Sequence, residues 1–363
     1  MRRVKSNVPR ADGRMTNRLV LTRRDLVVGG IAALLAVWGL TSRAHDSGNA
    51  ATTVANGADT ELYAAIVERM RAGEPYYRAA GTELSAQGYA TLPVTNWRLP
   101  TLATFEAALP ASNLQPIPLV VLGLAGVIAW YHAGATRGRG AWAAGLALLM
   151  LPAWASVKAT WFHELWAGQL ISLSLALWIA GRARASLGAA AGALAVRELA
   201  AIYVVIMALL ELRRRGWRAL MPWVGLLALF GVVLLLHWAA AYMSLPANPL
   251  RNSWVALGGW PFVLSAARGQ VALLFWPFWI HALLVPALWW GLWRARGDDT
   301  ALAIVVTVYF ATFMVIGRPD NYYWGLLIAP LLPLGVLGWL PVPSASSAPI
   351  HDQHEQRAAR PER

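Results

Sequence analysis

The sequence predicts an all-α polytopic membrane protein, and three observations lead to that prediction. Hydrophobic residues make up 58% of the 363 residues, charged residues only 13%, and the mean hydropathy is +0.47, whereas soluble domains are near half apolar and a quarter charged. The apolar residues fall into runs that approach the length needed to cross a bilayer, about 20 residues. The basic residues cluster between those runs, where they set membrane topology. These observations exclude a soluble enzyme, a fibrous protein and a disordered chain.

The same composition limits the chemistry. The chain has no cysteine, which excludes disulfides, thiol catalysis and cysteine-ligated metal sites. A net charge of +13 would suggest nucleic-acid binding in a soluble protein. Here the charge lies in short clusters between apolar runs, so we expect the lipid bilayer as a partner and no nucleic acid.

The first apolar run, 26–40, follows eight basic residues. The positive-inside rule therefore predicts that residues 1–24 are a basic cytoplasmic N-terminus. Residues 25–340 are predicted to form a single transmembrane domain, and the tail 341–363 to be disordered and cytoplasmic. Eight further apolar runs follow the first, at 116–133, 141–159, 165–181, 186–212, 217–242, 271–293, 300–317 and 322–340.

Nine simple crossings would place the arginine cluster 213–218 outside, against that rule. Run 186–212 removes the conflict, because it carries Arg197 and Glu198 near its middle. A charged pair in the bilayer is costly unless it faces protein or a wet cavity. We therefore expect a broken helix hairpin here, which gives about ten membrane segments. Both termini are then cytoplasmic, with 21 of the 31 basic residues on that side.

This topology leaves two long outer segments, 43–115 and 243–270. In the larger one, residues 44–57 are predicted to be a flexible linker. Asp59 is then expected to cap a helix in which Leu62, Ile66 and Met70 recur every four residues. This helix is predicted to lie on the membrane surface, and further short juxtamembrane helices follow it.

Several of these features together resemble the GT-C superfamily of integral membrane glycosyltransferases, in particular bacterial mannosyltransferase-like members. The resemblance covers most of residues 20–340. It rests on a first membrane helix, a large outer loop in which an acidic residue opens a surface helix, and a hairpin broken at a charged residue. The motifs that carry it are Asp59-Thr60-Glu61-Leu62-Tyr63, Glu74-Pro75-Tyr76-Tyr77, Arg98-Leu99-Pro100, Ala167-Gly168-Gln169, Arg197-Glu198 and Pro319-Asp320-Asn321-Tyr322-Tyr323-Trp324.

The resemblance implies an enzyme that transfers a sugar from a polyprenyl-phosphate-linked donor to a glycan, lipid or protein acceptor. It implies a protein of the bacterial inner membrane, with its active face periplasmic. The catalytic aspartate of the family, in the first outer loop, matches Asp59. Such a transfer needs a carboxylate as general base and cations that hold the departing phosphate. The alternative for Asp59 is a helix cap only.

Other residues are weighed in the same way. Glu164, beside His163, is either a second catalytic, metal-binding or acceptor-binding group or an interfacial cap. Arg197 and Glu198 either bind the carrier phosphate or form an ion pair that holds the hairpin. Four further candidates are each open to a simpler structural interpretation: Arg98 and Arg318 as phosphate or headgroup contacts, and Asp320 and Asn321 as site groups or a cap.

Trp97 and Tyr76 are candidates for stacking on a sugar ring, although most aromatic residues here are expected in the core or the interfacial belt. No metal ligand set is assigned. A divalent metal, Mg²⁺ or Mn²⁺, is left open, because it would need more oxygen ligands than His163 and Glu164 provide.

Two rival functions remain open. A transporter or lipid flippase would suit ten segments and an intramembrane Arg–Glu pair, but the sequence shows no repeat between its halves, and a large ordered outer loop is unusual for a carrier. A non-catalytic scaffold would not need its charged groups gathered on one face.

Overall fold

The computed structural model describes residues 22–42, 58–110, 112, 114–135, 138–252, 256–268, 276–295 and 300–340. Across these ranges the regular structure is helical, with a single isolated bridge between Leu92 and Arg251. The prediction of an all-α protein is therefore confirmed. The predicted linker 44–57, the tail 341–363 and all but the last residues of the basic N-terminus lie outside the described residues.

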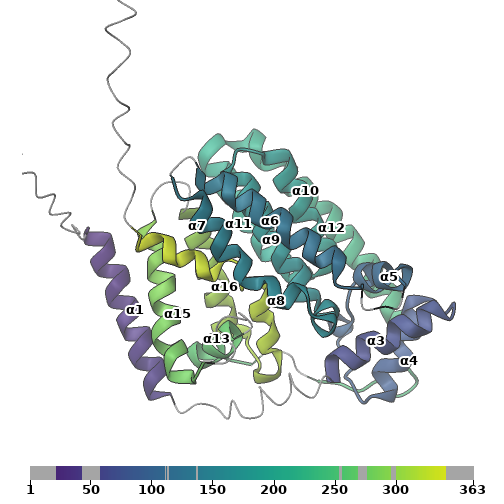
Figure 1. Cartoon of the computed structure of the whole chain (residues 1–363). Coiled ribbons are helices and arrows are strands. Elements are labelled where there is room, and N and C mark those ends of the chain that lie inside the picture. Colours follow the sequence, from purple (N-terminus) through teal and green to yellow (C-terminus); the bar gives the residue numbers. More distant parts are fainter. Residues whose placement is uncertain are drawn as a thin grey trace, which may run out of the picture.

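The helices form two groups, an outer unit and a larger bundle (Figure 1). The outer unit contains α3 (Ala58–Arg71), α4 (Tyr76–Ala86), η1 (Val94–Asn96) and α5 (Pro100–Ala108). The bundle contains α1 (Arg23–Thr41), α6 (Ile117–Ala135), α7 (Gly140–Ala147), η2 (Leu148–Met150), α8 (Leu151–Trp154), η3 (Val157–Trp161), α9 (His163–Ile179), α10 (Ala183–Val196), η4 (Glu198–Ala200), α11 (Ala201–Arg215), α12 (Trp217–Met243), α13 (Gly259–Ala267), α15 (Phe278–Arg294), α16 (Thr300–Ile316), η6 (Pro319–Leu327) and η7 (Leu332–Gly338).

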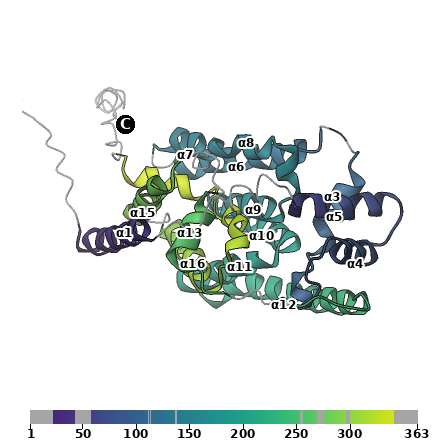
Figure 2. The same ribbon diagram turned by 90° about the horizontal axis from the view of Figure 1, so that it is seen from below.

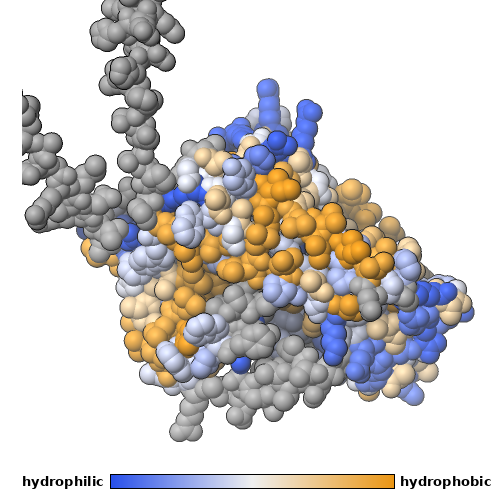
Figure 3. Space-filling view, in the orientation of Figure 1, coloured by the Kyte–Doolittle hydropathy of each residue, from blue (hydrophilic) through white to orange (hydrophobic). Residues whose placement is uncertain are grey.

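Three of these helices, α1, α6 and α12, are long and apolar enough to cross a membrane, and the bent pair of η6 and η7 would make a fourth. Most of α1 and α12 is exposed, and their outward side chains are apolar. Figure 3 shows this as broad hydrophobic areas over the bundle, whereas the outer unit is mainly hydrophilic. These helices favour a membrane protein, because so much exposed apolar surface is unfavourable in water.

The apolar run 186–212 is two helices, as the sequence predicts. Helix α10 ends at Val196, Arg197 has an extended backbone (φ −147°), and α11 begins at Ala201 after the short turn η4. A break at this point lets the Arg197 side chain leave the helix surface and find charged partners within the protein. The cost of a buried charge is lowered when it is paired in this way.

Other predicted spans are less regular than expected. Run 141–159 is divided into α7, η2, α8 and η3. Run 322–340 is two 3₁₀ segments that meet at a 50° bend. In that second run the backbone packs directly on α15, since a Cβ added to Gly338 would lie 1.9 Å from the carbonyl oxygen of Gly291. The number of membrane segments, about ten, stays a prediction.

The segment 243–270, predicted to be an outer loop, contains a buried helix. Helix α13 packs against α15, α16 and η6, and its Trp260, Phe262 and Val263 side chains are in the bundle core. Counting apolar residues missed this helix because it is short, nine residues. Tertiary contacts rather than length bury it.

The outer unit has a small core of its own. It includes Leu62 and Ile66 of α3, Leu84 of α4 and Trp97, and it also takes Ala241 from the end of α12, which runs beside α4 (Figure 2). The apolar face of α3 is therefore packed against protein, and the position of this helix at the membrane surface stays a prediction. That face is already covered by α4 and α5, which exclude lipid from it as well as water.

Candidate functional site

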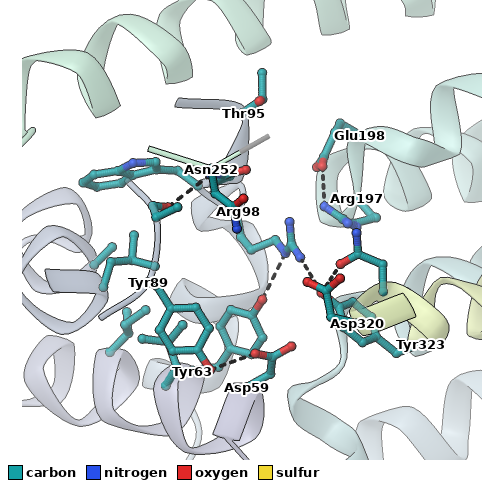
Figure 4. Close-up of a pocket in the computed structure, with 18 of the residues that line it drawn as sticks. Asp59, Tyr63, Tyr89, Thr95, Arg98, Arg197, Glu198, Asn252, Asp320 and Tyr323 are labelled. Atoms are coloured by element: carbon teal, nitrogen blue, oxygen red, sulfur yellow. Dashed lines mark hydrogen bonds and ion pairs between the residues drawn. The ribbon is translucent and has the colours of Figure 1, made fainter. Parts of the chain in front are cut away.

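A cavity of about 330 Å³ lies between the outer unit and the bundle. Helices α3 and α4 and the segment after them form one wall, and the α10–η4 break and η6 form the other (Figure 4). Nine of the eleven residues that the sequence singled out line it: Asp59, Tyr76, Trp97, Arg98, Arg197, Glu198, Arg318, Asp320 and Asn321. The fold thus gathers groups that lie as much as 262 positions apart in the chain.

Asp59 stands in the first turn of α3, which begins at Ala58. It is therefore one residue inside the helix and not the N-cap that the sequence suggested. A carboxylate in a first turn is favoured by the positive end of the helix dipole. The hydroxyl of Tyr89 donates a hydrogen bond to Oδ1 of Asp59 at 2.8 Å, so a neutral donor orients the carboxylate at the cavity surface.

Arg98 extends from the same wall to the centre of the cavity. Its Nε donates to the hydroxyl of Tyr63 at 3.1 Å, and an Nη donates to the hydroxyl of Tyr323 at 3.4 Å. Burial raises the pKa of Tyr63 to about 12, although the charge of Arg98 acts to lower it. Tyr63 is therefore a neutral phenol, and tyrosine hydroxyls do not neutralise the charge of the Arg98 guanidinium. The carboxylate of Glu164 is more distant, at 3.9 Å.

The other wall is built on Arg197, whose residue is 1% exposed. Its Nε lies 2.7 Å from Oε1 of Glu164, as an ion pair that lacks hydrogen-bond geometry. Its Nη1 donates to the carboxylate of Glu198. Two carboxylates therefore neutralise this guanidinium, and Glu164 sits behind Arg197 rather than on the cavity surface.

The rim of the cavity on the bundle side is closed by a second ion pair. Arg318 contacts both carboxylate oxygens of Asp320, at 3.0 and 2.9 Å. Next to it the hydroxyl of Tyr323 donates to the amide oxygen of Asn321 at 3.2 Å. Tyr323 thus connects the rim to Arg98.

Three predicted site residues have other positions than expected. Glu164 and His163 do not line the cavity, and the His163 ring stacks obliquely on Tyr63 from behind, at 4.8 Å between centroids. Trp97 borders the cavity but is only 2% exposed, and its Nε1 donates to the carbonyl of Thr91. Its ring belongs to the core of the outer unit, so it is not available as a platform for a sugar.

The structure adds three tyrosines that sequence analysis did not assign to the site. Tyr63 could have been found, because it lies four residues after Asp59 on the same helix face. Tyr323 is part of a motif that was noted, but its contact with Arg98 spans 225 residues. Tyr89 gave no signal, since only the turn after α4 brings it back to α3.

A second buried carboxyl lies in α5, away from the cavity. Glu106 is fully buried, and neither of its carboxylate oxygens has a hydrogen-bond partner in the part of the chain described. Burial raises the pKa of this carboxyl to about 7, and the nearby charge of Arg71 lowers it only in part. Arg71 itself donates to the backbone carbonyls of Glu106 and Leu109, at the end of α5.

The described residues contain no group of three His, Asp or Glu side chains that could hold a metal ion. Three arginines and three carboxylates line the cavity. Of these, Arg197 with Glu198 and Arg318 with Asp320 are ion pairs. Asp59 and Arg98 contact mainly tyrosines instead. The arrangement can therefore offer a proton acceptor and a cation to one bound molecule.

Comparisons with protein-family models, curated proteins and solved structures find no match for this chain.

Proposed function

We propose that the protein is a membrane glycosyltransferase of the GT-C type. It would transfer a sugar from a polyprenyl-phosphate-linked donor to a glycan, lipid or protein acceptor. The observation that supports this most strongly is the cavity itself, in which Asp59 and Arg98 face one space and neither forms a close ion pair with another residue of the described ranges. The side-chain chemistry suits an acidic leaving group and a hydroxyl nucleophile.

In the proposed reaction Asp59 takes the proton of the acceptor hydroxyl while the oxygen of that hydroxyl attacks the anomeric carbon of the donor sugar. The bond from that carbon to the phosphate oxygen breaks, and the bonding electrons leave with the carrier phosphate. Arg98 stabilises the negative charge that develops there, by charge-assisted hydrogen bonds. Tyr89 holds the carboxylate of Asp59 and Tyr63 holds the guanidinium.

Arg98 and Arg197, two of the three arginines that line the cavity, have different roles in this proposal. Arg197 carries two carboxylate partners, so little of its charge is left for a phosphate. Arg98 donates its hydrogen bonds to the hydroxyls of Tyr63 and Tyr323. We therefore propose Arg98 as the main phosphate contact and Arg197, with Glu164, as the support that holds the wall of the cavity opposite.

The proposal includes the topology of about ten segments in a bacterial inner membrane, with both termini cytoplasmic and the cavity periplasmic. Contacts between basic residues and helix ends support the assignment of several segment ends to the same side of the membrane. The guanidinium of Arg24 lies over the ring of Trp293, Arg294 lies over Trp339, and Arg139 donates to the carbonyl of Leu340. The sequence places all of these on the cytoplasmic side.

The test is Asp59→Asn, with Glu61→Gln as the matched control. Glu61 is an exposed acid in the same helix turn that does not line the cavity. We expect Asp59→Asn to lower sugar transfer by about 10²- to 10⁴-fold, the range for loss of a general base, with unfolding temperature unchanged. Cells that carry it should accumulate the polyprenyl-linked sugar and lose the glycan. Normal turnover by Asp59→Asn would exclude the mechanism, and unchanged glycans with altered solute uptake would favour a transporter.

A further inference from the structure

Six exposed arginines lie together at the end of the bundle away from the cavity. They flank two helix turns, one between α9 and α10 and the other between α11 and α12: Arg182, Arg184, Arg213, Arg214, Arg215 and Arg218. We call this set the arginine face. Figure 3 shows strongly hydrophilic side chains that project at the top of the view, opposite the outer unit.

The two turns are held against each other by specific contacts. The guanidinium of Arg214 lies 4.2 Å from the centre of the Trp178 ring, and the indole N–H of Trp178 donates to the buried carboxylate of Glu211. Arg215 forms an ion pair with the same carboxylate at 3.5 Å. The arginines of both turns therefore form one surface of fixed shape.

The charge of this surface is unbalanced. The arginine face carries six guanidinium groups, and the carboxylate of Glu211, which pairs with Arg215, is buried beneath them. The outer unit is the reverse, with six acidic and four basic residues between positions 58 and 108. A ligand of the arginine face must therefore be anionic.

The backbone adds donors to the same surface. Helix α12 begins after Gly216 and α10 after Arg182, and neither N-cap residue makes a side-chain capping hydrogen bond. The first N–H groups of a helix have no partner within the helix, and together with the helix dipole they favour an anion. Arg182 precedes α10 and Arg218 lies in the first turn of α12, so an arginine stands at each of these helix starts.

The position of the surface indicates which anion it meets. Trp217, at the start of α12, is 62% exposed, and the exposed apolar side chains of Met221 and Val224 follow within two turns. Exposed tryptophan between arginine and an apolar helix face is typical of the headgroup level of a bilayer. We propose that the arginine face binds the phosphate headgroup of an anionic phospholipid in the adjacent leaflet.

This proposal does not depend on the glycosyltransferase proposal. The test uses the purified full-length protein in a neutral detergent and measures binding of fluorescently labelled phosphatidylglycerol, with labelled phosphatidylcholine for comparison. The variant is Arg182→Gln with Arg213→Gln, two exposed members of the arginine face that take no part in the contacts described for Arg214 and Arg215. The control is Arg78→Gln with Arg251→Gln, which removes the same charge from exposed positions outside the arginine face.

We expect the wild type and the control to bind phosphatidylglycerol in preference to phosphatidylcholine. Each arginine near an anionic surface contributes about 1 kcal/mol, so the double variant should bind phosphatidylglycerol about 30-fold more weakly. Replacement of both arginines by lysine should restore most of the binding. The proposal is overturned if the wild type does not distinguish the two lipids, or if the control loses as much affinity as the variant.

Discussion

The outer unit and the bundle bury charge in opposite ways where they face each other. In the bundle, Arg197 has Glu164 and Glu198 as partners at close range. In the outer unit, Asp59 and Arg98 are held by tyrosine hydroxyls, and Glu106 has no hydrogen-bond partner among the described residues. A charge that is already neutralised supports the fold, whereas one held by neutral donors can still act on a ligand. Under the proposed function, the paired charges of the bundle support the fold, and Asp59 and Arg98 of the outer unit act on the ligand.

The largest effect on stability is expected from Glu164→Gln. The change leaves Arg197 buried with one carboxylate instead of two, and breaking a buried ion pair typically costs roughly 3–5 kcal/mol. Chemical unfolding of the purified protein should show a loss of this size, and the exposed control Glu61→Gln should show almost none. Equal stability of Glu164→Gln and wild type would mean that the bundle does not depend on charge pairing.

Glu106→Gln should change the free energy of unfolding in the opposite direction, so that the variant is more stable than wild type at pH 8. A glutamate in the unfolded chain ionises near pH 4.5, whereas in the folded protein burial raises the pKa of Glu106 to about 7. The folded state therefore binds more protons between these values, and its free energy of unfolding falls as the pH rises through this window. At pH 8 the glutamine variant should be more stable than wild type by about 3 kcal/mol.

Below about pH 4.5 that advantage should disappear, because the carboxyl is then protonated in both states. Unfolding measured at several pH values checks this. A difference between variant and wild type that stays constant across the range would show that Glu106 finds a counter-charge, and the contrast between the two regions would fail.

Arg98→Gln should affect donor binding more than folding. Hydrogen bonds to a charged group contribute about 1.5–3 kcal/mol, so we expect the KM for the donor to rise roughly 30-fold, with the KM for the acceptor little changed. Arg78→Gln, an exposed arginine of the same unit, is the control. If both substrates lose affinity equally, Arg98 does not contact the phosphate.

The smallest effect is expected from Tyr89→Phe. It removes one hydrogen bond to Asp59, worth about 1 kcal/mol, so the turnover rate should fall about fivefold. Tyr77→Phe changes a tyrosine of the neighbouring helix that bonds to His237 and does not line the cavity. It should leave turnover close to wild type. A rate for Tyr89→Phe equal to wild type would mean that Asp59 is positioned by its helix alone.

Much of the site could be predicted from sequence, because charged residues are rare in this chain and their positions are therefore informative. The sequence predicts that Arg197 and Glu198 interrupt a helix, and α10 ends directly before them. The resemblance matches the catalytic aspartate to Asp59, and the sequence offers Arg98 as a phosphate or headgroup contact; the structure brings both to one cavity. The roles of Trp97 and Glu164 were not predictable, because burial behind neighbouring side chains depends on packing that no local pattern encodes.

The sequence by itself determined the helical class, the apolar helices and the break at Arg197. Backbone hydrogen bonding within a helix and the cost of moving a side chain out of water are properties of a short segment. Only the tertiary structure decided that α13 is buried, that Glu164 supports Arg197 and that Tyr89 holds Asp59. These contacts join residues 30 or more positions apart, or depend on neighbours from several helices, and such distances are set by how the helices pack.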